Sequence, residues 1–189
     1  MFLHCGYGSR SQTDLTVVNA DGKLRWAGMT RYRILRFLGA FLLLGAGALA
    51  FIGWVSTAPA LGPRSGQLQP CPASPNCVCS QDPAGPSEIS AFACGKGTTA
   101  LAELARLKVI VLAQSRMRLL EERPGYLRFE ATSALFRYKD DLEFLADEAA
   151  HVLQVRSASR VGHSDLGTNR RRVETLRQKF TAAVPTGHP

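Results

Sequence analysis

A run of nineteen apolar residues, from Phe37 to Val55, is the feature that most constrains what this chain can fold into. About 20 apolar helical residues span the hydrocarbon core of a bilayer. Arg31, Arg33 and Arg36 precede the run, and basic residues mark the cytoplasmic side of a membrane helix. The sequence therefore predicts one helix across the cell inner membrane, a cytoplasmic N-terminus and a C-terminal domain on the periplasmic side.

A cleaved signal peptide is the competing interpretation of this run, because Ala58-Pro59-Ala60 resembles a small-x-small cleavage site. Signal peptides carry a shorter apolar region of about 7–15 residues, which favours an uncleaved anchor. Residues 1–28 show neither a helical nor a strand period. Two interpretations stay open for them: a cytoplasmic tail over 1–36, or translation that begins at Met29.

The rest of the chain is long enough for one domain with one core. Residues 56–70 are rich in Pro, Gly and Ser and are expected to be a linker, residues 71–183 the exported domain, and residues 184–189 a disordered tail. The net charge is +8, of which residues 1–36 supply +4, from six Lys/Arg and two Asp. Membrane lipid is the expected partner, and nucleic acid is not, because the basic domain is predicted to lie outside the cytoplasm. The sequence identifies no protein partner.

Four cysteines follow the apolar run: Cys71, Cys77, Cys79 and Cys94. In an oxidising compartment cysteines form disulfides before they serve as metal ligands, and this spacing is poor for zinc. Cys77 and Cys79 are too close in sequence to pair readily. We expect a Cys71–Cys77 bridge around a turn-rich loop and a Cys79–Cys94 bridge, and neither a metal nor a cofactor.

Periodicity in the domain predicts an α+β fold. A helix is expected from Ala100 to about Gln114 after a Thr98 or Thr99 cap, and a second from Thr168 or Asn169 to about Ala182. Four strands are expected between them, at 117–122, 126–133, 140–146 and 151–158. The whole is a transmembrane helix followed by an antiparallel meander flanked by two helices.

The third and fourth strands read as a hairpin. With a turn at residues 148 and 149, Leu142 lies opposite Val155 and Asp141 opposite Arg156. This register satisfies the apolar pattern and the charge pattern together.

Opposite charges concentrate in two neighbouring segments. Residues 140–148 carry five acidic residues and no basic ones, whereas residues 156–179 carry seven Lys/Arg against Asp165 and Glu174. We expect the two segments to pair in the fold. The residues expected in structural ion pairs are Asp140, Asp141, Glu143, Arg156 and Arg170.

The segment that precedes and enters the last helix, residues 156–172, is the best candidate for a functional site. Arginines beside a glycine-containing loop could bind an anion such as a lipid headgroup, with Arg160, His163, Arg171 and Arg172 as ligands. The alternative is a small hydrolase-like enzyme that uses the Ser157–Asp165 loop, with the catalytic candidates His163, Asp165 and Ser159. No Gly-x-Ser-x-Gly elbow is present. We therefore favour a structural or anion- and lipid-binding role over catalysis.

Three blocks of the domain resemble a known family, the domain of unknown function 1499. They are the Cys71–Val78 loop, the Ser133–Phe144 segment with its acidic core, and the arginine- and glycine-containing segment from Arg156 to Arg170. The resemblance covers most of residues 70–181. It implies a small exported, lipoprotein or membrane-tethered protein and no established activity. Cys79 stands where the family usually has Ser, which supports the additional Cys79–Cys94 bridge.

Overall fold

The computed structural model describes residues 17–18, 24–25, 29–55 and 57–183. Its contacts divide the chain into two compact units, residues 1–46 and 47–189. The first contains the antiparallel pair β1 (Val17–Val18) and β2 (Leu24–Arg25) and the beginning of helix α1 (Met29–Val55). The expected tail at 184–189 and most of the expected N-terminal tail lie outside the described residues.

Helix α1 contains a stretch, Tyr32–Phe51, that is long and apolar enough to cross a membrane, with a mean hydropathy of 2.1. Its large apolar side chains are exposed, among them Phe41, Leu42 and Leu43. A helix on the surface of a soluble protein hides one apolar stripe, whereas a membrane helix is apolar all round. The helix begins eight residues before the predicted apolar run, because residues 29–36 are also helical.

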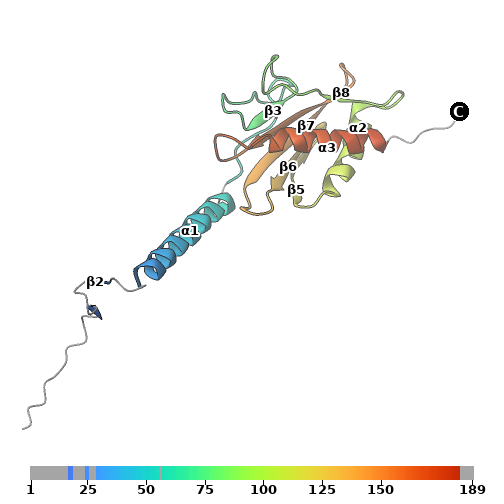
Figure 1. Ribbon diagram of the computed structural model, residues 1–189. Helices are drawn as coiled ribbons and strands as arrows, with labels where there is room; N and C mark the ends of the chain where they lie inside the picture. Colours follow the sequence, from blue (N-terminus) through green and yellow to red (C-terminus); the bar gives the residue numbers. More distant parts are fainter. Residues whose placement is uncertain (1–16, 19–23, 26–28, 56, 184–189) are drawn as a thin grey trace, which may run out of the picture. The chain divides into compact units, whose positions relative to one another are not determined.

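The second unit is the predicted α+β domain (Figure 1). Its elements are β3 (Cys77–Cys79), β4 (Phe92–Ala93), α2 (Ala100–Leu112), β5 (Met117–Arg123), β6 (Tyr126–Thr132), β7 (Lys139–Asp147), β8 (Val152–Ser159) and α3 (Thr168–Ala182). The sheet is antiparallel in the order β3-β8-β7-β6-β5, and β4 also pairs with β8. The predicted meander is β5 to β8.

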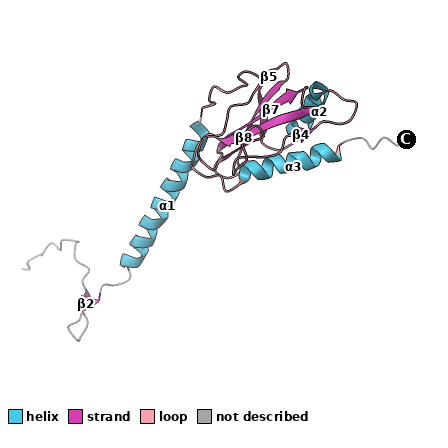
Figure 2. Ribbon diagram, turned by 90° about the horizontal axis from the view of Figure 1, so that it is seen from above, coloured by secondary structure: helices cyan, strands magenta, loops and turns pink. Residues whose placement is uncertain are grey.

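One face of the sheet packs against both helices, and α3 runs along the strands in Figure 2. Alternation directs Leu127 and Phe129 of β6 and Phe144 of β7 to this face. The helices contribute buried residues at helical spacing: Leu104, Leu107, Val111, Val173, Leu176 and Phe180. Each large apolar side chain contributes about 1.5–3 kcal/mol when buried, so this core fixes the helices on the sheet.

The β7–β8 turn differs from the prediction. It covers four residues, 148–151, and His151 adopts a left-handed φ of 55°. Glu143 therefore pairs with Arg156, and Leu142 with Ser157, so the predicted Asp141–Arg156 pairing is wrong by two residues. A shift of two keeps every side chain on its face, which is why the apolar pattern could not detect it.

The longer turn has a structural role at the start of α2. The Glu148 carboxylate accepts hydrogen bonds from the backbone N–H groups of Ala100 and Leu101, both at 2.9 Å. Thr99 caps the same helix by accepting from the Ala102 N–H. Together they satisfy three of the N–H groups that a helix leaves unpaired at its start.

Cys71 and Cys77 form a disulfide, but Cys79 and Cys94 are both free, so the second expected bridge is wrong. Cys79 lies opposite Arg156 and packs with Leu68 on the face turned away from the helices. Cys94 packs against the core on the helix-covered face. The sheet itself separates the two thiols.

Peptide mapping without reductant should recover Cys71 joined to Cys77, with Cys79 and Cys94 as thiols. Burial raises the pKa of the Cys79 thiol, and Cys79 is fully buried. Burial also raises the pKa of the Cys94 thiol, so exposure separates the two, and iodoacetamide should modify Cys79 in the native protein more slowly than the partly exposed Cys94. Both should react after unfolding. A Cys79–Cys94 cross-linked peptide would contradict this arrangement.

Candidate functional site

Charged side chains occupy the face of the sheet turned away from α2 and α3, which we term the open face. They form a buried charge cluster of three arginines and three carboxylates: Arg128, Arg156, Arg160, Glu130, Asp141 and Glu143. Each of these side chains is at most 8% exposed. Three positive and three negative charges leave the cluster formally neutral, as burial of charge requires.

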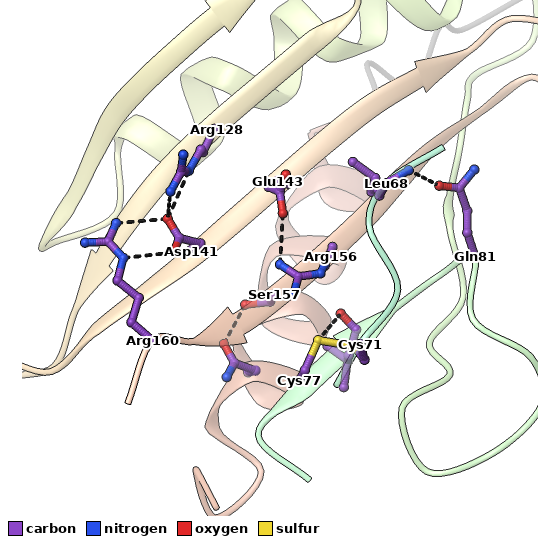
Figure 3. Close-up of polar contacts among 12 residues, drawn as sticks. Leu68, Cys71, Cys77, Gln81, Arg128, Asp141, Glu143, Arg156, Ser157 and Arg160 are labelled. Atoms are coloured by element: carbon purple, nitrogen blue, oxygen red, sulfur yellow. Dashed lines mark hydrogen bonds and ion pairs between the residues drawn. A yellow bond between two sulfur atoms is a disulfide. The ribbon is translucent and has the colours of Figure 1, made fainter. Parts of the chain in front are cut away.

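Asp141 lies between two guanidinium groups (Figure 3). Arg128 donates to its Oδ1 from Nε and Nη2 at 3.0 and 2.7 Å, and Arg160 donates from Nε to Oδ2 at 2.8 Å. Arg160 also reaches Glu130 on β6 at 2.8 Å. Burial alone would lower the pKa of Arg160, but its bonds to Asp141 and Glu130 raise it, so the guanidinium stays charged.

Glu143 is the second centre of the cluster and is fully buried. The Tyr126 hydroxyl donates to Oε1 at 2.7 Å, and Arg156 Nη1 donates to Oε2 at 3.0 Å. Burial and the neighbouring Glu143 raise the pKa of Tyr126, so the phenol remains a donor. Arg156 Nε is buried and has no hydrogen-bond partner within the described residues.

Part of the expected linker packs on the open face. Leu68 is 4% exposed, contacts Tyr126 and Cys79, and donates its N–H to Gln81 Oε1 at 2.8 Å. Gly62, at a φ of 129°, lies so close to Arg123 that a Cβ there would come within 2.3 Å of its guanidinium. These contacts and the low exposure of the cluster indicate a structural role for its charges.

A second polar group lies on the other face and holds the first turn of α3. Arg172 bonds Asp140 Oδ2 at 2.5 Å, and the Ser157 hydroxyl donates to Asn169 Oδ1 at 2.6 Å. Asn169 in turn donates to the Asn76 carbonyl at 2.9 Å. Arg172 was expected to bind a ligand, but its guanidinium instead donates to the Asp140 carboxylate on β7.

The arginines are distributed differently from the expectation. Arg160 belongs to the buried charge cluster instead of a ligand site. Arg170, expected in an ion pair, instead donates to the carbonyls of Pro86 and Glu88, each at 2.7 Å. The numbers of charges in the sequence predict which segments lie together in the fold. They do not predict which arginine reaches a carboxylate, because this depends on the direction in which each side chain points.

The three catalytic candidates do not form a triad among the described residues. The Asp165 carboxylate accepts from the N–H groups of Gly167 and Asn169 at the start of α3, at 2.9 and 2.7 Å. The Ser159 hydroxyl accepts from Asn169 Nδ2 at 3.0 Å. His163 is exposed, and no described hydrogen bond joins it to either residue. The described part of the chain also contains no group of three potential metal ligands.

Three loops meet at one end of the sheet, which we term the loop end: residues 72–76, 133–138 and 160–167. Backbone hydrogen bonds join Ser159 to Asn76 and Arg160 to Lys139 there. Two leucines project from these loops, Leu135 at 78% and Leu166 at 83% exposure. Leu166 has a left-handed φ of 53°, and Arg171 Nη1 donates to its carbonyl at 2.7 Å.

The side chains of Arg137 and Arg171 are exposed beside these leucines. The loop end thus exposes both apolar and basic side chains. Sequence analysis identified Arg171 but missed both leucines, because a single leucine in a loop creates no period. The neighbouring arginines are the one sequence signal that could have indicated them.

Replacing Glu143 with Gln should strongly destabilise the protein, because Arg156 would keep a buried charge without its carboxylate. Breaking a buried pair from one side costs about 3–5 kcal/mol. Adding Arg156→Gln should cost less than the sum of the single changes, which measures the coupling between them. Denaturant unfolding of the detergent-solubilised chain gives these free energies.

The half-exposed Lys108–Glu122 pair provides the matched control. Glu122→Gln should change the free energy of unfolding by about 0–1 kcal/mol, as surface pairs do. An effect of Glu143→Gln no larger than this control would show that the buried pair does not stabilise the sheet.

Comparison with known proteins gives one match. The model of the family described as a protein of unknown function, DUF1499, matches residues 67–180. This segment runs from the start of the packed domain through β3 to β8 and most of α3. No curated protein and no solved structure matches the chain. The match covers more than half of the chain, which therefore belongs to the DUF1499 family.

Proposed function

We propose that this protein is an exported domain anchored by α1 in the inner membrane, and that its loop end binds an anionic lipid surface without catalysis. The observation that carries the proposal is the pair of exposed leucines, Leu135 and Leu166, beside the exposed Arg137 and Arg171. A hydrolase is less well supported, because Ser159 and Asp165 are occupied by structural hydrogen bonds.

Exposed leucines and arginines suit the lipid interface together. Apolar side chains enter the boundary between headgroups and acyl chains, and each basic residue near an anionic surface adds about 1 kcal/mol of attraction. The Leu166 N–H donates to Ser164 Oγ at 3.3 Å and its carbonyl accepts from Arg171 Nη1 at 2.7 Å, so hydrogen bonds hold the backbone on both sides of Leu166. The leucine is therefore already positioned for binding, which lowers the entropy lost on docking.

The loop end lies at the end of β6 opposite to the point where the chain enters the domain. Gly62 packs on Arg123 at the β5–β6 turn, so the chain enters the domain at that turn. Strand β6 runs from the turn to the loop at 133–138 and has seven residues. At about 3.3 Å per residue it separates the two ends by about 20 Å. The proposed lipid contact is therefore made by the end of the domain farther from this entry point.

A reporter fused after Pro189 and active only outside the cytoplasm should be active, because the arginines at the start of α1, before its apolar run, retain the N-terminus inside. A reporter that works only in the cytoplasm should be silent at the same position. The reverse pair of results, with both fusions expressed, would invert the proposed topology.

The full-length chain in nanodiscs of neutral lipid should co-sediment with anionic vesicles more than with neutral ones, and added salt should weaken this binding. Arg137→Gln should lower the affinity about fivefold, the equivalent of about 1 kcal/mol. Leu135→Ser should also lower it, because it removes an apolar contact.

Lys96→Gln is the matched control, since Lys96 is exposed in the loop between β4 and α2 and does not belong to the loop end. It should leave binding unchanged. Equal binding to neutral and anionic vesicles would contradict the proposal. So would a loss of affinity in Lys96→Gln as large as in Arg137→Gln. Either result would leave the loop end with a structural role only.

A further inference from the structure

An apolar groove of about 600 Å³ lies between α2 and the β5–β6 turn. Its apolar walls include Leu101, Leu104, Ala105, Val109, Leu112 and Leu127. This volume is within the range of about 300–1,000 Å³ that is typical of small-molecule sites. The groove is separate from the buried charge cluster and from the loop end.

Helix α2 exposes apolar side chains on the groove side although its other side is in the core. Leu101, Val109 and Leu112 are 53%, 69% and 44% exposed. Apart from α1 and the two leucines of the loop end, they are the large apolar side chains that the described residues expose. Their clustering along one groove indicates a binding site, since scattered exposed leucines would need no explanation.

The charged side chains that line the groove already have partners. Lys108 Nζ lies 2.6 Å from Glu122 Oε2, and Arg123 pairs with Glu121 at 2.8 Å while its guanidinium stacks on Tyr126. The groove therefore offers contact to an uncharged apolar chain and no free charge to a headgroup. A chain without polar backbone groups suits such walls, because it brings no hydrogen-bonding group to leave unsatisfied.

The groove is also within reach of the bilayer. Arg123, one of its lining residues, packs against Gly62, which is seven residues beyond Val55 at the end of α1. Seven extended residues span at most about 25 Å. With α1 in the membrane, a linker of this length allows the groove to reach lipid.

We propose that this groove binds a single acyl chain of a membrane lipid, with the headgroup outside it. The inference rests on α1 as the membrane anchor but does not depend on binding at the loop end. The occupant we propose is a phospholipid of the bilayer, because the short connection to α1 allows the groove to reach it; a free fatty acid carries the same chain and is the alternative that the experiment must exclude.

The test uses the full-length protein in vesicles with two photoactivatable probes, a fatty acid and a phosphatidylcholine that each carry a diazirine in the chain. Illumination should label peptides of α2 and of the β5–β6 turn. Labelling by the phospholipid supports the proposal, whereas labelling by the fatty acid alone would overturn it.

Ala105→Trp should fill the groove and reduce α2 labelling about tenfold, the equivalent of about 1.4 kcal/mol in binding. Ala102→Trp is the matched control, because Ala102 is exposed on the same helix and does not line the groove. Both variants should melt near the wild-type temperature, since both alanines are exposed. Val109→Asp provides a second way to weaken the site, by placing a charge in it.

Labelling confined to α1, or equal loss in Ala102→Trp and Ala105→Trp, would overturn the proposal. Cross-linking of a co-purified protein to the groove in place of either probe would also overturn it, and would assign the groove to a protein partner. Ala105→Trp should not change the recruitment of anionic vesicles. Failure of the groove and failure of the loop end are therefore distinguishable.

Discussion

The carboxylate of Asp141, held between the guanidinium groups of Arg128 and Arg160, is the interaction on which the sheet depends most. These three residues come from β6, β7 and the end of β8, so one buried carboxylate joins three neighbouring parts of the meander. Desolvation of each charge is costly and is offset only when every partner is in place. A register that separated one partner would leave a buried charge unpaired, so the cluster disfavours slipped pairings more strongly than the apolar face can.

The elements of the domain could be predicted from the sequence because their signals are local. Thr99 caps α2 as the sequence indicated, and the apolar spacing of Val173, Leu176 and Phe180 marks α3. The β7–β8 register could not be predicted, because its turn length depends on a distant contact. Glu148 is held in the turn by N–H groups 47 and 48 residues earlier in the chain, and no local pattern reveals this bond. The free Cys79 and Cys94 have a similar cause, since only the assembled sheet places them on opposite faces.

For the candidate sites, too, the composition of the segments was informative but the geometry of the contacts was not predictable. Opposite charges in two segments predicted that Asp141 and Glu143 would meet arginines, but the partner predicted for Asp141, Arg156, pairs with Glu143 instead. Arg128 and Glu130 were missed altogether, because their alternation with Leu127 and Phe129 reads as a solvent-facing side of β6. Glu130 lies directly opposite Asp141, so two like charges face each other across the strands, and Arg160 is the group that bonds both of them.

Both faces of the sheet are buried, and the domain presents two different surfaces, one at each end of β6. The groove beside α2 lies at the β5–β6 turn, where Gly62 enters, and Leu135 lies beyond the other end of β6. The charge cluster ties β6 to β7 and β8 between these ends, so the separation of about 20 Å along the strand is fixed by the sheet. Neither surface borrows residues from the other, and neither requires the buried charges to open. The two proposed bindings, of an acyl chain in the groove and of an anionic surface at the loop end, therefore use separate residues of the same sheet and can be tested one at a time.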